Sequence, residues 1–278
     1  MRERVVRFGP GECLSGVLAE PDPARVRRDA PVIVLSNVGM HTRAGPTRMW
    51  VLLARQLAGD GWSVLRFDHS GLGDSAARGG ALSDLERAGV EQREAVSFLV
   101  DRHAATGAVL VGFCSGVDGV HLATVAEPRV VGAFYLDGYA YPTPGFHLRR
   151  RTLRLLKPAI WRNFAQRRLG LLRALLEQRP PLPPPVYDRT YPPPAALARD
   201  LRAVLERGAR LLFAWSEGRE HEFNHPGQFY DMLAAPDLRG RVEVACLVDC
   251  DHLFASAAAR AKLFGLFKAW LGAQFPAA

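Results

Sequence analysis

The stretch Ala108-Val-Leu-Val-Gly-Phe-Cys-Ser-Gly116 decides the fold of this chain. It begins with a short apolar run that is typical of a fully buried strand, and it leads into a helical sequence. Between them, Gly112-Phe-Cys-Ser-Gly116 places a nucleophilic side chain between two glycines. Side chains at the two glycine positions would collide with the neighbouring strand and helix. The sequence therefore predicts a sharp turn that presents the thiol of Cys114.

The centre of this turn is Cys114 and not the serine beside it. A turn centred on Ser115 would require glycines at positions 113 and 117, which hold Phe113 and Val117. A thiol at a helix N-terminus has a lowered pKa, because the positive end of the helix favours the thiolate. We therefore expect Cys114 to act as a nucleophile.

Strands and helices alternate on both sides of this turn. Further strands are expected at 31–36, 62–67, 130–136, 211–215 and 242–248, and helices at 47–61, 83–103, 194–207, 228–233 and 256–271. Ser83 and Glu86 are spaced as a capping box. A hairpin is expected around Gly9-Pro10-Gly11 within residues 4–19. This order predicts the α/β class, with a doubly wound, mostly parallel sheet.

Residues 141–193 interrupt the alternation. They begin with basic helical sequence and end in the proline-rich stretches Arg179–Pro185 and Tyr191–Pro194, which favour an extended arm. We therefore predict a core formed by residues 1–140 and 194–278, with residues 141–193 inserted as a helical, basic lid.

Two loops after expected strands carry further motifs. The loop Ser36-Asn-Val-Gly-Met-His41 follows the first buried strand, and Arg66-Phe-Asp-His-Ser-Gly-Leu-Gly-Asp-Ser75 follows the next. With the turn at Cys114, these stretches resemble the α/β-hydrolase superfamily over residues 5–272. More narrowly, Asn37–Arg48, Leu65–Ser75, Gly112–Asp118 and Asp137–Pro144 resemble a bacterial subgroup that includes the exosortase-system-associated hydrolases. The cysteine at the nucleophile position is similar to that of dienelactone hydrolases.

The resemblance implies a role for each motif. The loop after the first buried strand supplies one oxyanion-hole N–H, from Val38 or Gly39, and Ser115 supplies the other. Asn37 shapes that loop, and the Asp68–Ser75 stretch is a scaffold turn. His252 follows the last strand, in the family's chain order of nucleophile, acid and histidine. His41, His69 and His221 lie in loops on the same side and are candidates to line the pocket.

The acid of this triad has several candidates. Glu220, in the loop after the fifth expected strand, matches the usual position of the triad acid and is our first choice. Glu217 and Glu222 are rivals in the same loop, and Asp137, at the end of the preceding strand, is a topological alternative.

The predicted activity is cleavage of an ester or thioester through an acyl-cysteine intermediate. Two alternatives stay open: an acyltransferase or lyase that tailors a natural product or a carrier-bound acyl group with the same site, and a non-catalytic binding protein of the same fold. No cofactor or metal is expected, since the four cysteines have neither disulfide nor zinc-ligand spacing.

Charge and composition limit the partners. Between Arg149 and Arg173 there are nine Lys/Arg and no Asp or Glu, so this segment carries the net charge of +8. Two interpretations stay open: a solvated lid helix with its apolar face over the pocket, or a docking surface for acyl carrier protein, a coenzyme A thioester or an anionic membrane surface. Nucleic acid is not expected, because no nucleic-acid-binding motif accompanies the charge. The N-terminus lacks a secretory h-region and no apolar run could span a bilayer, so a cytoplasmic location is expected.

Overall fold

A single mixed sheet organises the part of the chain described by the computed structural model, residues 1–103, 105–156 and 189–276. The strand order is β1-β2-β4-β3-β5-β6-β7-β8. The strands are β1 (Arg2–Phe8), β2 (Leu14–Glu20), β3 (Val32–Leu35), β4 (Val64–Asp68), β5 (Ala108–Phe113), β6 (Val130–Leu136), β7 (Arg210–Ser216) and β8 (Val242–Leu247).

Strand direction separates the N-terminal hairpin from the rest of the sheet. β1 and β2 form an antiparallel hairpin, and β2 joins β4 in antiparallel fashion. Every pairing from β4 to β8 is parallel. The central strands are buried on both faces, which explains why they are continuous apolar runs in the sequence. The predicted doubly wound, mostly parallel sheet is confirmed.

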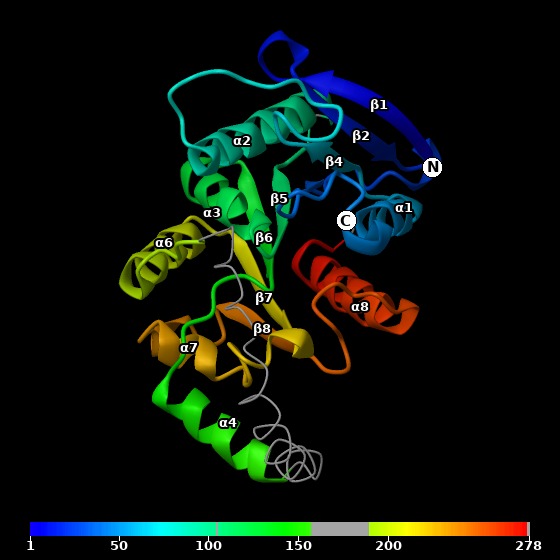
Figure 1. The fold of residues 1–278 in the computed structure, drawn as a ribbon. Helices are drawn as coiled ribbons and strands as arrows, with labels where there is room; N and C mark the ends of the chain where they lie inside the picture. The colour runs from blue at the N-terminus through cyan, green and yellow to red at the C-terminus, as the bar shows by residue number, and fades with distance from the viewer. Residues whose placement is uncertain (104, 157–188, 277–278) are drawn as a thin grey trace, which may run out of the picture.

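Helices cover both faces of the sheet (Figure 1). One face carries α2 (Asp84–His103), α3 (Gly116–Ala126) and α6 (Pro194–Glu206), and the other carries α1 (Met49–Gly59) and α8 (Ala257–Gln274). The short α7 (Gln228–Met232) lies between β7 and β8 in the chain. The predicted capping box begins α2, since Glu86 Oε2 accepts the Ser83 N–H at 2.9 Å and the Glu86 N–H donates to Ser83 Oγ at 3.3 Å.

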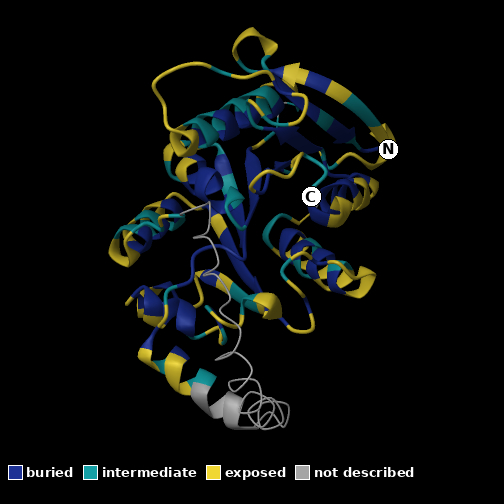
Figure 2. Cartoon of the chain, viewed as in Figure 1, coloured by how far each residue is buried: buried dark blue, intermediate teal, exposed yellow. Residues whose placement is uncertain are grey.

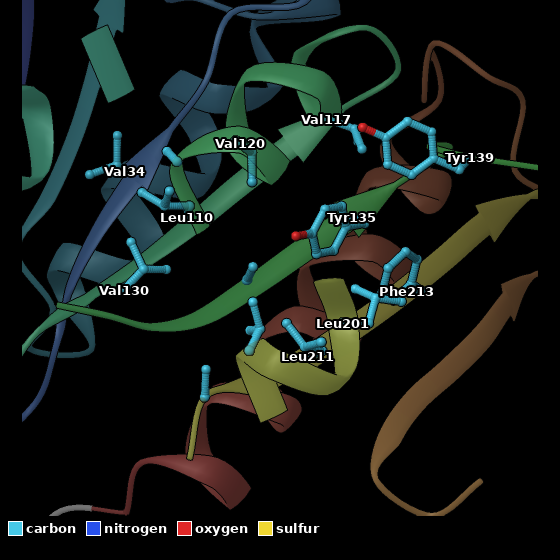
Figure 3. Close-up of a cluster of buried hydrophobic side chains, with 14 of the residues drawn as sticks. Val34, Leu110, Val117, Val120, Val130, Tyr135, Tyr139, Leu201, Leu211 and Phe213 are labelled. Atoms are coloured by element: carbon cyan, nitrogen blue, oxygen red, sulfur yellow. The ribbon is translucent and has the colours of Figure 1, made fainter. Parts of the chain in front are cut away.

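Two apolar cores lie on the two faces of the sheet, whose strands are largely buried (Figure 2). Figure 3 shows part of the core on the face that carries α2, α3 and α6. There Val117 and Val120 of α3 and Leu201 of α6 pack over β5, β6 and β7. Within it the rings of Tyr135 and Phe213 stack at 4.4 Å. Because these helices and strands are packed against each other, the loops at the carboxyl ends of the parallel strands rest on a rigid base.

The predicted insertion at residues 141–193 lies largely outside the described residues. α4 (Pro144–Leu156) occupies its beginning, and the description resumes at Arg189, so the stretch Arg179–Pro185 is not part of it. Phe146 on α4 is buried, and Arg149 Nε donates to Asn224 Oδ1 at 3.0 Å. Among the described helices, none combines the length and the apolarity that crossing a membrane requires.

Candidate active site

The turn between β5 and α3 has the strained geometry that its sequence predicts. Cys114 adopts a left-handed backbone conformation with φ of 51°, which is uncommon for a non-glycine residue. A Cβ atom on Gly112 would lie 2.7 Å from Cα of Val117, and one on Gly116 would overlap the carbonyl oxygen of Asn37. The two glycines therefore let strand, helix and the loop after β3 meet around the thiol.

His252 lies between Cys114 and Asp137. Its Nδ1 is 2.8 Å from Oδ2 of Asp137. The ring lines the same cavity as Cys114, and the imidazole and the thiol shift each other's pKa. The imidazole packs on the Phe113 ring with centroids 5.0 Å apart. Because Nδ1 faces the carboxylate, Nε2 is the nitrogen that serves the thiol. The structure thus brings the predicted nucleophile and the predicted histidine together.

Asp137 directly follows β6, the strand next to the one that carries Cys114. The Cys114 N–H donates to the carbonyl of Leu136 at 2.9 Å, so strand pairing sets the two residues in register. The Asp137 side chain is fully buried and accepts from the N–H and the hydroxyl of Ser216, both at 2.6 Å. These bonds fix the position of the carboxylate independently of its contact with His252.

This geometry corrects the sequence-based choice of acid. The carboxylate beside His252 belongs to Asp137, the alternative, and not to Glu220, which is exposed just beyond a 3₁₀ turn. That turn meets the backbone of His252 and not its ring, because a Cβ atom on Gly218 would overlap the His252 nitrogen.

The two rival glutamates have other partners. Glu217 Oε2 accepts the Asp249 N–H at 2.7 Å and so holds the loop that follows β8. Glu222 is ion-paired with Arg219 and lies 3.2 Å from Nε2 of His221. Neither carboxylate contacts the ring of His252.

The pKa values of the thiol and the imidazole move in opposite directions. Burial raises the pKa of Cys114, but the hydrogen bond and charge of His252, together with the charges of Arg189 and Arg219, outweigh it and leave the pKa lowered. Hydrogen bonds from His252 to Asp137 and then to Cys114 raise the pKa of the imidazole to about 9. Both shifts favour a thiolate–imidazolium pair over the neutral thiol and imidazole.

The predicted oxyanion loop, residues 36–41, is hydrogen-bonded to the loop after β4 and to the turn at Cys114. Asn37 Nδ2 donates to the carbonyl of His41 at 2.7 Å, and Asn37 Oδ1 accepts the His69 N–H at 2.9 Å. Gly39, with φ of 48°, donates its N–H to Ser115 Oγ at 2.9 Å. The loop containing Val38 and Gly39 therefore lies directly beside the residue that follows Cys114.

The loop after β4 is a scaffold turn, as expected. Asp68 is fully buried, accepts the Arg43 N–H at 2.5 Å and is ion-paired with the Arg43 side chain. The Ser75 hydroxyl donates to the carbonyl of Asp68 at 2.6 Å and accepts the Ser15 N–H at 2.8 Å. Gly73 is required here, because a Cβ atom would overlap the Asp68 carboxylate.

A cavity of about 1040 Å³ opens over Cys114, Ser115 and His252. His41 and His69 line it, as predicted, whereas His221 is exposed and is not part of its wall. Sequence reasoning missed Arg189, Tyr191 and Arg219, which form another part of the wall.

A second cavity, of about 550 Å³, lies at the N-terminal ends of β7 and β8, whereas Cys114 lies beyond the carboxyl end of β5. Its lining includes Arg210 and Val242. It contains none of the residues discussed above.

Among the described residues, no group of three or more His, Cys, Asp or Glu side chains is arranged so that it could hold a metal ion.

Comparison with known proteins places the fold. No protein-family model and no curated protein matches the sequence. Solved structures do match over nearly the whole chain, among them an α/β serine hydrolase without a lid from Xanthomonas campestris, with TM-score 0.58, 16% identity, and coverage of 99% of this chain and 96% of that one. An esterase from Pyrococcus furiosus matches with TM-score 0.56, 13% identity, and 98% and 91% coverage. The esterase domain of a Rhodothermus marinus protein matches with TM-score 0.56, 18% identity and 97% coverage of both chains. The chain has the α/β-hydrolase fold.

Proposed function

We propose that this protein is a hydrolase that cleaves an ester or thioester through an acyl-enzyme formed on Cys114. The observation that carries the proposal is that His252, bound to the buried carboxylate of Asp137, lines one cavity together with Cys114, and that this cavity is large enough for a drug-sized molecule. The structural neighbours with esterase or hydrolase names support acyl chemistry on this fold.

Acylation starts from the thiolate–imidazolium pair. The Cys114 sulfur attacks the substrate carbonyl, and its electron pair forms a C–S bond while the carbonyl oxygen takes the negative charge. The N–H groups of Ser115 and of the loop after β3 stabilise that oxygen. Gly39 already donates to Ser115 Oγ, so Val38 is the better candidate for the second donor. When the tetrahedral species collapses, His252 gives its proton to the leaving oxygen or sulfur.

Deacylation uses the same groups in reverse roles. The neutral His252 removes a proton from a water molecule, which attacks the acyl-cysteine carbonyl. Collapse releases the carboxylic acid and restores the thiolate beside the imidazolium. Asp137 stabilises that imidazolium in both steps and keeps its proton on Nδ1. A thiol or amine in place of water would give acyl transfer, and only product analysis separates the two.

The test is the intact mass of the protein after incubation with a series of acyl thioesters. The wild type should gain the mass of one acyl group and release free acid, and Cys114→Ala should do neither. Cys13→Ala is the matched control, because Cys13 does not line the cavity, and it should behave as the wild type.

Two results would contradict the proposal. Unchanged acylation and turnover in Cys114→Ala would remove this thiol from the mechanism. Absence of both acylation and turnover in the wild type across esters and thioesters would favour the non-catalytic binding protein.

The docking of a carrier-bound or membrane-associated substrate on Arg149–Arg173 is a separate proposal. Only the beginning of this segment is described, and its basic sequence is what supports docking. If the segment recruits an anionic carrier, activity on carrier-bound acyl groups should fall at high salt while activity on a small neutral ester stays constant. Equal salt responses would contradict it.

A further inference from the structure

One wall of the cavity beside Cys114 is formed by an arginine that the reaction above does not use. Arg189 Nε and Nη2 donate to the two carboxylate oxygens of Asp118 at 2.6 and 2.7 Å. Both side chains are almost buried, with 11% and 12% of their surface exposed. Two parallel charge-assisted bonds of this kind fix an arginine in position as well as in orientation. Both residues line the cavity that contains Cys114.

Asp118 connects this pair to the nucleophile. It lies in the first turn of α3, about one helical turn after Cys114. Helix α3 begins at the turn that presents the thiol. A side chain that is bound to Asp118 therefore has a fixed position relative to the Cys114 sulfur. Arg189 lies near the end of the predicted insertion 141–193, where the description of the chain resumes. Its contact with Asp118 ties this returning chain, residues 189–193, to the helix that follows Cys114.

Two tyrosines complete the surroundings of the guanidinium group. The Cζ atom of Arg189 lies 4.8 Å from the ring centre of Tyr191 and 5.4 Å from that of Tyr139. Tyr139 follows Asp137 by two residues, and Figure 3 shows its ring beside Val117 of α3. The arginine therefore contacts side chains from the segment after β6, from α3 and from the chain that returns from the insertion.

Several charged or titratable groups line the cavity around the sulfur. They are His41 from the loop after β3, His252 from the loop after β8, Arg219 and Glu222 from the loop after β7, Asp118 from α3, and Arg189 and Tyr191 from the returning chain. On the side of α2, the cavity wall also contains the pairs His69–Glu91 and Asp84–Arg87. Arg189 and Arg219 both favour the ionised thiol. A cation beside the nucleophile helps a thiolate, whereas a serine hydroxyl stays neutral in the resting enzyme.

We propose that Arg189 is a positioning residue of the active site, which holds a positive charge against the Cys114 thiolate through its paired hydrogen bonds with Asp118. This inference rests on the proposed function, because it assumes that Cys114 is the nucleophile. It explains why a cysteine suits this cavity: the wall stabilises the charged form of the side chain that attacks.

The test measures alkylation of Cys114 by iodoacetamide as a function of pH, with the modified residue identified by peptide mass. In the reaction the thiolate sulfur displaces iodide, so the rate reports the thiolate fraction. Arg189→Met should move the midpoint to higher pH and slow alkylation at pH 6 by roughly threefold or more, because a neighbouring positive charge is lost. Asp118→Asn keeps a side chain of the same shape, whose oxygen still accepts a hydrogen bond from Arg189. It should therefore move the midpoint to lower pH, because a negative charge is lost while the arginine stays in place.

The opposite directions separate a charge effect from simple loosening of the structure, which would move both variants the same way. Arg189→Lys retains the charge without the paired bonds and should shift the profile less than Arg189→Met. Arg202→Met and Asp237→Asn are the matched controls, because this ion pair lies on the surface and outside the cavity wall. Neither control should move the midpoint.

Equal shifts in the same direction for Arg189→Met and Asp118→Asn, or no shift in either, would overturn the inference and leave the proposed function standing. Circular dichroism spectra matching the wild type would show that the variants fold. If Arg189→Met does not fold, the shift is measured on Arg189→Lys instead. Failure of the proposed function has a different signature, which is full turnover of thioesters by Cys114→Ala.

Discussion

The Nδ1 atom of His252 lies 2.8 Å from Oδ2 of Asp137, a residue 115 positions earlier in the chain. Ser216, from the neighbouring strand β7, donates two further hydrogen bonds to the same carboxylate. The carboxylate that meets His252 therefore follows β6, next to the strand that leads to Cys114, and it is held by Ser216 at the end of β7. This arrangement leads to the first prediction.

Asp137→Asn should lower kcat on an activated thioester by about 10²-fold or more, because the imidazolium loses its charged partner and the preferred tautomer changes. Glu220→Gln is the matched control and should retain most of the wild-type rate, since Glu220 does not contact the histidine ring. Steady-state kinetics of the two variants would decide the matter. A large loss in Glu220→Gln with an active Asp137→Asn would reverse the assignment.

The pH dependence follows from the two shifted pKa values. The pKa of Cys114 is lowered and that of His252 is raised to about 9. Below the thiol pKa the sulfur is protonated, and above about 9 the imidazole has lost the proton that the leaving group needs. We therefore expect kcat/KM for a poor leaving group to be highest between these values and to fall as the pH rises past about 9.

A series of kcat/KM measurements from about pH 5 to about pH 10 checks this expectation. An alkaline fall centred near the ordinary histidine pKa of about 6.5 would mean that the ion pair does not form. With a good leaving group the alkaline fall should be weaker, because protonation by His252 matters less.

Gly116 is required where the loop after β3 touches the nucleophile turn. In Gly116→Ala the new methyl group would overlap the carbonyl of Asn37, so the loop must move away from Ser115. We expect a loss of about 1–3 kcal/mol in the free energy of unfolding from this overlap, with a lower rate of acylation. Chemical denaturation and acylation kinetics measure the two effects.

Gly265→Ala provides the comparison for this prediction. Gly265 lies within α8, and nothing lies within 4 Å of a Cβ atom added there. Alanine is favoured over glycine in a helix, so this variant should gain up to about 1 kcal/mol of stability and keep its activity. Equal stability of the two variants would show that the close approach at Gly116 is not significant.

The buried Asp68 holds the loop after β4 through its ion pair with Arg43. Asp68→Ala should destabilise the protein by about 3 kcal/mol, because it leaves the largely buried guanidinium of Arg43 without its main partner. Asp74 also pairs with Arg43 but is 64% exposed, so Asp74→Asn should cost clearly less stability than Asp68→Ala. Urea unfolding of the two variants tests this, and similar losses would contradict it.

Local sequence was sufficient for most of the architecture. The apolar runs at 108–113 and 130–136 are buried strands, and the cap at Ser83 and Glu86 begins a helix, because both features depend on residues close together in the chain. The turn at Cys114 was predictable for the same reason, since its motif is local and Gly112 is demanded by contacts within the turn. Gly116, in contrast, leaves room for the loop after β3. Asn37 and the scaffold turn at Asp68 also lie where their motifs indicated.

The partner of His252 depended on contacts that no local pattern encodes. Several acidic residues end strands or follow them. The pairing of β6, β7 and β8 selects Asp137, because it places Ser216 and His252 around one carboxylate. Arg189 is a similar case, because the residues it binds lie far from it in sequence. Short-range signals describe strands, helices and turns, whereas the charge around the thiol arises from side chains that meet only when the sheet is assembled.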